Sequence, residues 1–211
     1  MSESLPVRRI AVGVTGASGA IYAVRTIAAL LDIGCHLDVV FSEYGRRLLM
    51  DELGPEAKVD RLPELLAARY GERAAGAGRI VVHQNRDLGA ALASGSHRCD
   101  AMVIVPCSMK TLAGVAHGLS RNLIERAADV MLKEHRKLIV VPRETPMSLP
   151  QLKNMVACAE AGAMVMPAMP AFYQGPQTID DLASFMAGKI LAALGIRHDL
   201  YPSWTGERRI P

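Results

Sequence analysis

Short apolar runs and longer amphipathic segments follow one another along the chain. Runs of four to seven apolar residues predict buried strands, while apolar residues three and four positions apart predict helices. By this pattern the strands span residues 9–14, 36–41, 79–83, 101–105, 138–141 and 163–166. The helices span residues 20–31, from Ser42 to Leu53, 123–135, from a capping box at Ser148 to Gly162, and 178–194.

This alternation indicates βαβ units, in which each helix crosses over a growing parallel sheet. We therefore predict an α/β fold with a doubly wound, mostly parallel sheet in three layers. The chain has 211 residues without an internal repeat or linker, so we expect one domain over 1–211. The segment 54–78 is the least regular, with a short helix predicted over 62–70 and a flexible loop over 74–78.

The C-terminal tail, residues 195–211, has no periodicity and carries the only tryptophan, Trp204. A lone tryptophan in a tail typically covers a core edge or lies at a subunit interface. We expect this tail to lie at a subunit interface.

Composition narrows the class of function. The formal net charge is only +3 and aromatic residues make up 4% of the chain, which argues against a nucleic-acid-binding surface and suits an anionic small molecule. The apolar runs are too short to cross a bilayer, and the N-terminus lacks the pattern of a signal peptide. We expect a cytoplasmic protein that binds no membrane.

The cysteines and histidines do not form a metal motif. None of the four cysteines makes a C-x-x-C pair, and the six histidines lack H-x-x-x-H spacing. We therefore expect neither a metal site nor a disulfide framework. Cys35, Cys99 and Cys158 are interpreted as small buried thiols, while Cys107 falls within a candidate ligand turn.

Two turns rich in small residues follow predicted strands. The first is Gly13–Gly19, and the second begins at Pro106 and runs to Thr111. Each turn leaves backbone N–H groups exposed at a helix start, which suits an anion or a polar ring edge. Because the carboxyl ends of parallel strands meet at one edge of the sheet, the two turns predict a ligand crevice.

The first turn does not match a dinucleotide fingerprint. Its glycines are spaced G-x-x-G-x-x-G, and the second predicted strand ends in Ser42 where a ribose-binding acid would stand. A mononucleotide therefore fits better than a dinucleotide. The alternative, a tight turn without a ligand, is disfavoured because a second such turn is present.

Basic residues occur on one predicted helix and after the next strand. Arg126 and Lys133 are seven positions apart and share a helical face, where Asp129 could pair with either. From spacing alone a solvated, salt-bridged helix is favoured. Arg143 and Glu144 follow a strand, at the edge where open sheets bind ligands.

Five segments together resemble the UbiX-type flavin prenyltransferases, in order and over nearly the whole chain. They are Gly13–Gly19, Pro106–Ala113, Asn122–Glu134, Val141–Pro146 and Pro167–Tyr173. Their combination is highly specific, although the glycine-rich turn alone is not.

The resemblance implies a flavodoxin-like Rossmann subunit that assembles into a homo-oligomer, typically a dodecamer, and binds reduced FMN where subunits meet. It implies transfer of a dimethylallyl group from dimethylallyl monophosphate to N5 and C6 of the flavin, without a metal. The product, prenylated FMN, would serve a UbiD-type decarboxylase.

The resemblance also assigns roles to residues. The implied FMN contacts are Gly16, Ala17, Ser18, Ser42, Ser108, Met109, Lys110, Thr111 and Arg143. The implied ligands of the prenyl phosphate are Arg126, Lys133, Tyr173 and Lys189, where the family commonly has Arg at the last position. Catalytic roles fall to Ser18 as a proton relay, Lys133, and the acids Glu52 and Glu144, with Trp204 as a candidate aromatic wall.

Two other functions stay open on the sequence. An FMN-dependent cysteine decarboxylase shares the expected fold, but the Pro106–Thr111 turn and the Arg143-Glu144 pair fit that family poorly. A flavin-binding module without catalysis is the second alternative. In the favoured interpretation Cys107 packs beside the site and is not a nucleophile.

Overall fold

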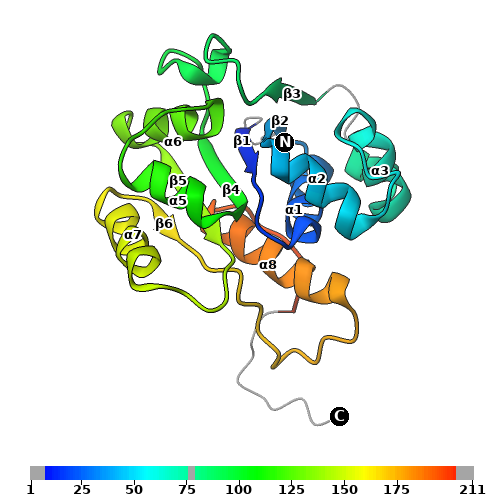
Figure 1. Ribbon diagram of the computed structural model, residues 1–211. Helices are drawn as coiled ribbons and strands as arrows, with labels where there is room; N and C mark the ends of the chain where they lie inside the picture. The colour runs from blue at the N-terminus through cyan, green and yellow to red at the C-terminus, as the bar shows by residue number, and fades with distance from the viewer. Residues whose placement is uncertain (1–7, 76–78, 203–211) are drawn as a thin grey trace, which may run out of the picture.

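The computed structural model describes residues 8–75 and 79–202. Its sheet has six strands in the order β3-β2-β1-β4-β5-β6, and every neighbouring pair is parallel (Figure 1). The strands are β1 (Arg9–Val14), β2 (His36–Phe41), β3 (Ile80–Gln84), β4 (Ala101–Cys107), β5 (Lys137–Pro142) and β6 (Met164–Val165). The predicted doubly wound parallel sheet is confirmed.

Helices cover both faces of the sheet and give three layers, as predicted (Figure 1). One face carries α1 (Ala20–Asp32), α2 (Glu43–Leu53), α3 (Leu62–Tyr70), α4 (Glu72–Ala75) and α8 (Ile179–Ala193). The other face carries α5 (Met109–Ala116), α6 (Leu123–Lys133) and α7 (Leu149–Glu160). None of the helices in these described ranges is long and apolar enough to cross a membrane.

Two apolar cores lie on either side of the sheet. Along β1, Val12 packs in the core beneath α1 and α8, while Ala11 packs in the core beneath α6. This alternation explains why the central strands are apolar at nearly every position: side chains on both faces are covered. The edge strand β3 differs, because Val81 and Val82 are exposed.

Several boundaries differ from the sequence prediction. Ala74 and Ala75 were expected in a loop but belong to α4, where both are buried. Strand β4 continues through Cys107, two residues beyond the predicted end. Helix α6 ends at Lys133, because His135 takes a left-handed backbone conformation with φ of 53°. Strand β6 has only two residues, and Pro167 soon after it lacks an N–H donor.

The strand order places a topological switch point between β1 and β4. From β1 the chain builds outward through β2 and β3, then returns to the opposite side of β1 and continues with β4, β5 and β6. Open α/β sheets bind ligands at the carboxyl ends of the strands at such a point. The two candidate turns follow β1 and β4 and so meet there.

Candidate functional site

A cavity of about 460 Å³ opens at this switch point. It lies within the range of about 300–1,000 Å³ that is common for small-molecule sites. Five of the predicted FMN contacts line it, and they come from the ends of three strands: Gly16, Ser42, Ser108, Lys110 and Thr111. Ala17 and Met109 belong to the same two turns, but both are buried.

Three helices begin at the cavity, and the residue that caps each of them lines its wall. Ser42 Oγ accepts from Gly45 N at 3.0 Å, and Ser108 Oγ accepts from Thr111 N at 3.3 Å. Asn122 Oδ1 accepts from Glu125 N at 3.0 Å in the same way. The positive ends of α2, α5 and α6 therefore converge on one space, which favours an anionic or acceptor-rich ligand.

The turns after β1 and β4 are fastened to each other by Thr15. This buried side chain donates from Oγ1 to Pro106 O at 2.8 Å and accepts from Ser108 N at 2.7 Å. Gly16 is required beside it, because a Cβ there would lie 2.5 Å from the Cβ of Tyr44. These hydrogen bonds hold the two turns together, so that they form one side of the cavity.

Seven further residues line the cavity and were not predicted as site residues: Glu43, Tyr44, Asn85, Arg121, Asn122, Ile124 and Glu125. Asn85 directly follows β3, and its Oδ1 accepts from Ile124 N at 3.2 Å. It lies two residues beyond the predicted strand 79–83, and polar residues just after a strand are the signal that could have found it. Asn122 could have been found as the helix cap ahead of the apolar run of α6.

One of these unpredicted residues is a buried acid. Glu125 is 2% exposed, and its Oε2 accepts from Arg121 N at 3.0 Å and lies 3.4 Å from Arg121 Nε. A buried carboxylate is costly without such partners. Two cations, Arg121 and Lys110, line the cavity. Arg121 is paired with Glu125, whereas Lys110 has no ion pair among the described side chains.

A second group of predicted residues holds the turn between β1 and α1. Arg143 Nε donates to Ser18 O at 3.0 Å. Glu52 accepts from Gly19 N at 2.9 Å and from Ala20 N at 2.7 Å. Because the capping residue Gly19 has no side chain, Glu52 supplies the carboxylate that caps α1. Glu144 lies beside Arg143 and accepts from Thr145 N at 3.1 Å.

Arg126 and Lys133 do not line the cavity. Arg126 Nε donates to Ala93 O at 3.1 Å, and its Nη1 pairs with Asp129 at 2.7 Å. The predicted Arg126–Asp129 pair is thus present, whereas Lys133 pairs with Glu134 and not with Asp129. Both cations lie along α6, on its flank next to residues 93–95.

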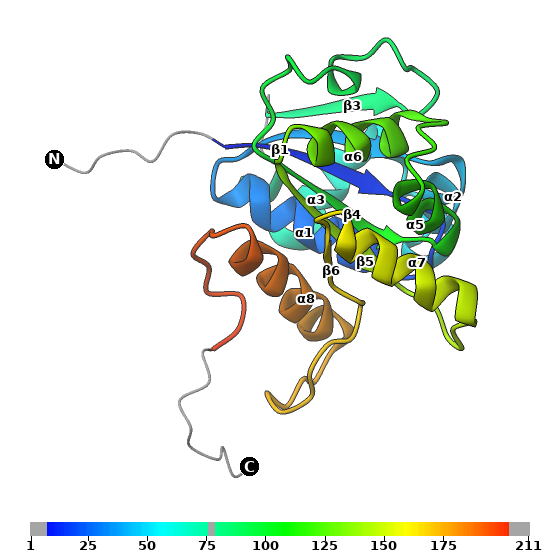
Figure 2. The same ribbon diagram turned by 90° about the vertical axis from the view of Figure 1, so that its left-hand side faces the viewer.

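Tyr173 and Lys189 lie on the other side of the sheet, with α8. The Tyr173 ring meets Phe185 edge to face at 6.2 Å between centroids, and Lys189 is exposed on the same helix. The loop that carries Tyr173 projects from the body of the subunit (Figure 2). One chain therefore does not bring the four predicted phosphate ligands together. Trp204 lies outside the described residues.

Cys107 is a packing residue. Its side chain is fully buried, and its Sγ donates to Ser108 O at 3.6 Å. Burial raises the pKa of this thiol far above its usual range, so the reactive thiolate is disfavoured. Within residues 8–75 and 79–202, no group of three or more His, Cys, Asp or Glu side chains is arranged to hold a metal ion.

The fold and the cavity define a class of protein: a doubly wound α/β protein that binds an anionic mononucleotide at its switch point. In agreement, the family model described as Flavoprotein matches residues 1–191. The chain is 46% identical over 200 residues to "Flavin prenyltransferase UbiX" of Halalkalibacterium halodurans, covering 93% of each chain. The predicted family is therefore confirmed: this chain belongs to the UbiX-type flavin prenyltransferases.

Solved structures agree with this assignment. AnUbiX (PadA1), determined in complex with FMN and dimethylallyl pyrophosphate, has a TM-score of 0.83 and 35% identity, covering 95% of this chain and 99% of that one. A dodecameric FMN-dependent UbiX-like decarboxylase from Escherichia coli O157:H7 has a TM-score of 0.80 and 36% identity, covering 93% and 100%. The predicted flavodoxin-like fold is thus confirmed.

Proposed function

We propose that this protein is a flavin prenyltransferase that joins the dimethylallyl group of dimethylallyl monophosphate to N5 and C6 of reduced FMN. The observation that most directly supports this proposal is the cavity at the switch point. Gly16, Ser42 and Ser108 line it, and three helix N-termini converge on it. Its polar wall, at which three helix N-termini converge, fits a flavin mononucleotide, which has both a phosphate and an acceptor-rich ring edge.

Reduced FMN supplies the nucleophilic ring atoms, and the chain binds, orients and screens it. The Thr15 hydrogen bonds fix the turns after β1 and β4, so the flavin contacts are set before binding. Arg143 joins these turns to the end of β5 through Ser18. Because the two turns are already held in place, they lose little conformational entropy when the ligand binds.

The prenyl donor brings a phosphate that must leave. Cations beside its oxygens stabilise the charge that develops as the bond between carbon and oxygen breaks. Arg126, Lys133 and Lys189 supply such cations, and the Tyr173 hydroxyl supplies a hydrogen-bond donor. We assign Glu144 the role of protonating the departing phosphate, with Ser18 as a relay. Glu52 accepts from Gly19 N and Ala20 N and so holds the turn that carries Ser18.

The donor site is completed by a second copy of the chain. Arg126 and Lys133 lie on the α6 side of the sheet, while Tyr173 and Lys189 lie with α8 on the opposite side. A homo-oligomer that places the α6 flank of one copy against the Tyr173 loop of another joins the two halves. The dodecameric state in the name of the UbiX-like relative supports such an assembly, which would also include the tail 195–211.

A UbiD-type decarboxylase would receive the product, and the reaction would take place in the cytoplasm. The names of the relatives favour prenyl transfer over the cysteine decarboxylase and the non-catalytic flavin module. The thiol of Cys107 is fully buried, so it offers no nucleophile at the cavity.

Mass spectrometry tests the proposal. The purified protein is incubated without oxygen with reduced FMN and dimethylallyl monophosphate, and in a parallel reaction with the diphosphate. The expected product is a flavin heavier by one C5H8 unit. Absence of this product with both donors would overturn the proposal, and consumption of a cysteinyl substrate would favour the decarboxylase.

A further inference from the structure

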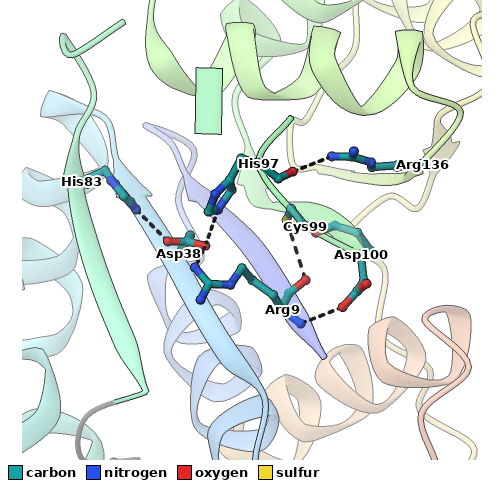
Figure 3. Close-up of polar contacts among 8 residues, drawn as sticks. Arg9, Asp38, His83, His97, Cys99, Asp100 and Arg136 are labelled. Carbon is teal, nitrogen blue, oxygen red and sulfur yellow. Dashed lines mark hydrogen bonds and ion pairs between the residues drawn. The ribbon is translucent and has the colours of Figure 1, made fainter. Parts of the chain in front are cut away.

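A buried carboxylate with two histidines lies outside the flavin cavity. Asp38 on β2 is 2% exposed, and its side chain meets His83 Nε2 at 2.8 Å and His97 Nε2 at 3.3 Å (Figure 3). Arg9 Nη1 approaches the same carboxylate at 3.4 Å. An ionised carboxylate only accepts, so each imidazole donates from Nε2. Nothing in the flavin or phosphate sites described above uses this cluster.

The two histidines reach Asp38 from different parts of the chain. His83 belongs to the edge strand β3, where it pairs in register with Val40 on β2. His97 belongs to residues 91–97, here called the 91–97 segment, which contacts α6. Asp38 is therefore the point at which this segment is fastened to the sheet.

The 91–97 segment is held at several further points. Leu92 is buried in the core on the α6 side of the sheet. Arg136, just after α6, donates from Nη1 to His97 O at 2.9 Å and from Nη2 to Gly95 O at 2.7 Å. His97 is thus fixed twice, by its side chain to the sheet and by its carbonyl to the end of α6.

The same segment contacts Arg126 and Lys133, the two cations of α6 that the proposed function assigns to the prenyl phosphate. Ala93 O accepts from Arg126 Nε at 3.1 Å. A Cβ at Gly95 would overlap Glu134 Oε1 and lie 2.9 Å from Lys133 Nζ, so the ion pair of Lys133 with Glu134 lies directly against Gly95. Long basic side chains lose much rotamer freedom when they bind a phosphate, so a support that restricts them beforehand lowers that cost.

We propose that Asp38 and His97 are positioning residues for the prenyl donor: they fasten the 91–97 segment so that it holds Arg126 and Lys133 in place for the phosphate. This inference rests on the proposed function. It predicts a separation of effects, because the lining of the flavin cavity includes neither residue. Loosening the segment weakens binding of dimethylallyl monophosphate and leaves FMN binding intact.

The test compares two substitutions at position 97. His97→Ala removes the anchor, whereas His97→Gln keeps an N–H donor close to the Nε2 position. We expect His97→Ala to raise KM for dimethylallyl monophosphate about tenfold, because one ordered contact is lost. The FMN Kd should stay within about twofold of the wild-type value. His97→Gln restores KM to within about twofold of the wild type. His117→Ala, at an exposed histidine that contacts Asn154, is the matched control without effect.

Asp38→Asn provides a second measurement that does not depend on the alanine variant folding well. The amide offers one acceptor oxygen where the carboxylate offers two, so KM for the donor rises while the FMN Kd is kept. An unchanged KM in both His97→Ala and Asp38→Asn overturns the inference. A parallel rise in KM and in the FMN Kd also overturns it, because that result indicates general loosening of the subunit.

Two controls separate this inference from the proposed function. If the wild-type protein makes no prenylated flavin, the proposed function fails. If it makes the product but Arg126→Ala leaves KM for the donor unchanged, the phosphate role of α6 fails. If Arg126→Ala raises KM while His97→Ala does not, only the positioning role of the Asp38 cluster is overturned.

Discussion

Arg143 Nε donates to the backbone carbonyl of Ser18 at 3.0 Å, across 125 residues of sequence. The bond joins the end of β5 to the turn that follows β1, so one side chain holds two segments at the carboxyl edge of the sheet together. Tyr22 lies close by: burial raises the pKa of its hydroxyl, and the positive charge of Arg143 partly lowers it. Arg143 therefore fixes the fold of the turn, and we predict that it also contributes to binding an anion.

Replacing Arg143 tests this double role. Arg143→Met removes the hydrogen bond to Ser18 O and one positive charge while keeping an unbranched apolar stem. We expect the FMN Kd to rise at least about tenfold, equivalent to about 1.4 kcal/mol, as measured by flavin fluorescence titration. Arg61→Met, which removes an exposed pair with Glu56, is the control. Equal Kd values for the two variants would contradict a flavin role for Arg143.

Ser108 offers a charge test that preserves the helix cap. Asp is as good an N-cap as Ser, so Ser108→Asp keeps α5 while adding a negative charge at the cavity wall. We expect weaker FMN binding with little change in Tm, since the added carboxylate repels the phosphate and acceptor atoms of the ligand. Ser148→Asp makes the same change at the cap of α7 and should leave the FMN Kd unchanged. Unchanged flavin retention in Ser108→Asp would place that turn outside the site.

Lys133 separates donor binding from flavin binding. Lys133→Ala should abolish prenyl transfer while FMN stays bound, because Lys133 does not line the flavin cavity. Product formation is followed by mass spectrometry and bound flavin by absorbance of the purified protein. Lys153→Ala on α7 is the control, since that exposed lysine does not line the flavin cavity and is not among the residues assigned to the phosphate. Loss of FMN together with activity would show that Lys133 was wrongly assigned to the phosphate.

The fold was predictable because it depends on local pattern. The apolar strands are buried on both faces, and the caps at Ser42, Ser148 and Thr178 begin helices as predicted. The turn at Ser108 was predictable for the same reason, since strand, turn and helix start are adjacent in sequence. Ala74 was wrongly expected in a loop, because its burial in α4 depends on packing against α1, which no local sequence pattern shows.

The site was only partly predictable because its groups come from distant segments. Helical spacing correctly placed Arg126 beside Asp129, yet it could not show that Arg126 contacts Ala93. Nor could it show that α6 and the Tyr173 loop lie on opposite sides of the sheet. Asn85 was missed because its role depends on the neighbouring α6, which follows almost forty residues later.

Buried thiols and tyrosines predict how stability changes with alkaline pH. Burial raises the pKa of Cys99 and of Cys158 to about 11, and burial together with Asp180 raises the pKa of Tyr70 to about 12. Such groups ionise more readily in the unfolded chain, where a thiol has a pKa of about 8.5. Their contribution is therefore complete below about pH 8.5 and is lost as the pH rises toward the folded-state values.

We expect the Tm of the flavin-free protein to be nearly constant from about pH 7 to 8.5 and to fall steadily between about pH 9 and 11. Differential scanning calorimetry in matched ionic strength measures this fall. Cys158→Ala removes one titrating group whose Sγ donates to Leu112 O, so its Tm should start lower but decline less steeply. A Tm that stays level to pH 11, or an equal slope in the variant, would show that these thiols do not control alkaline stability.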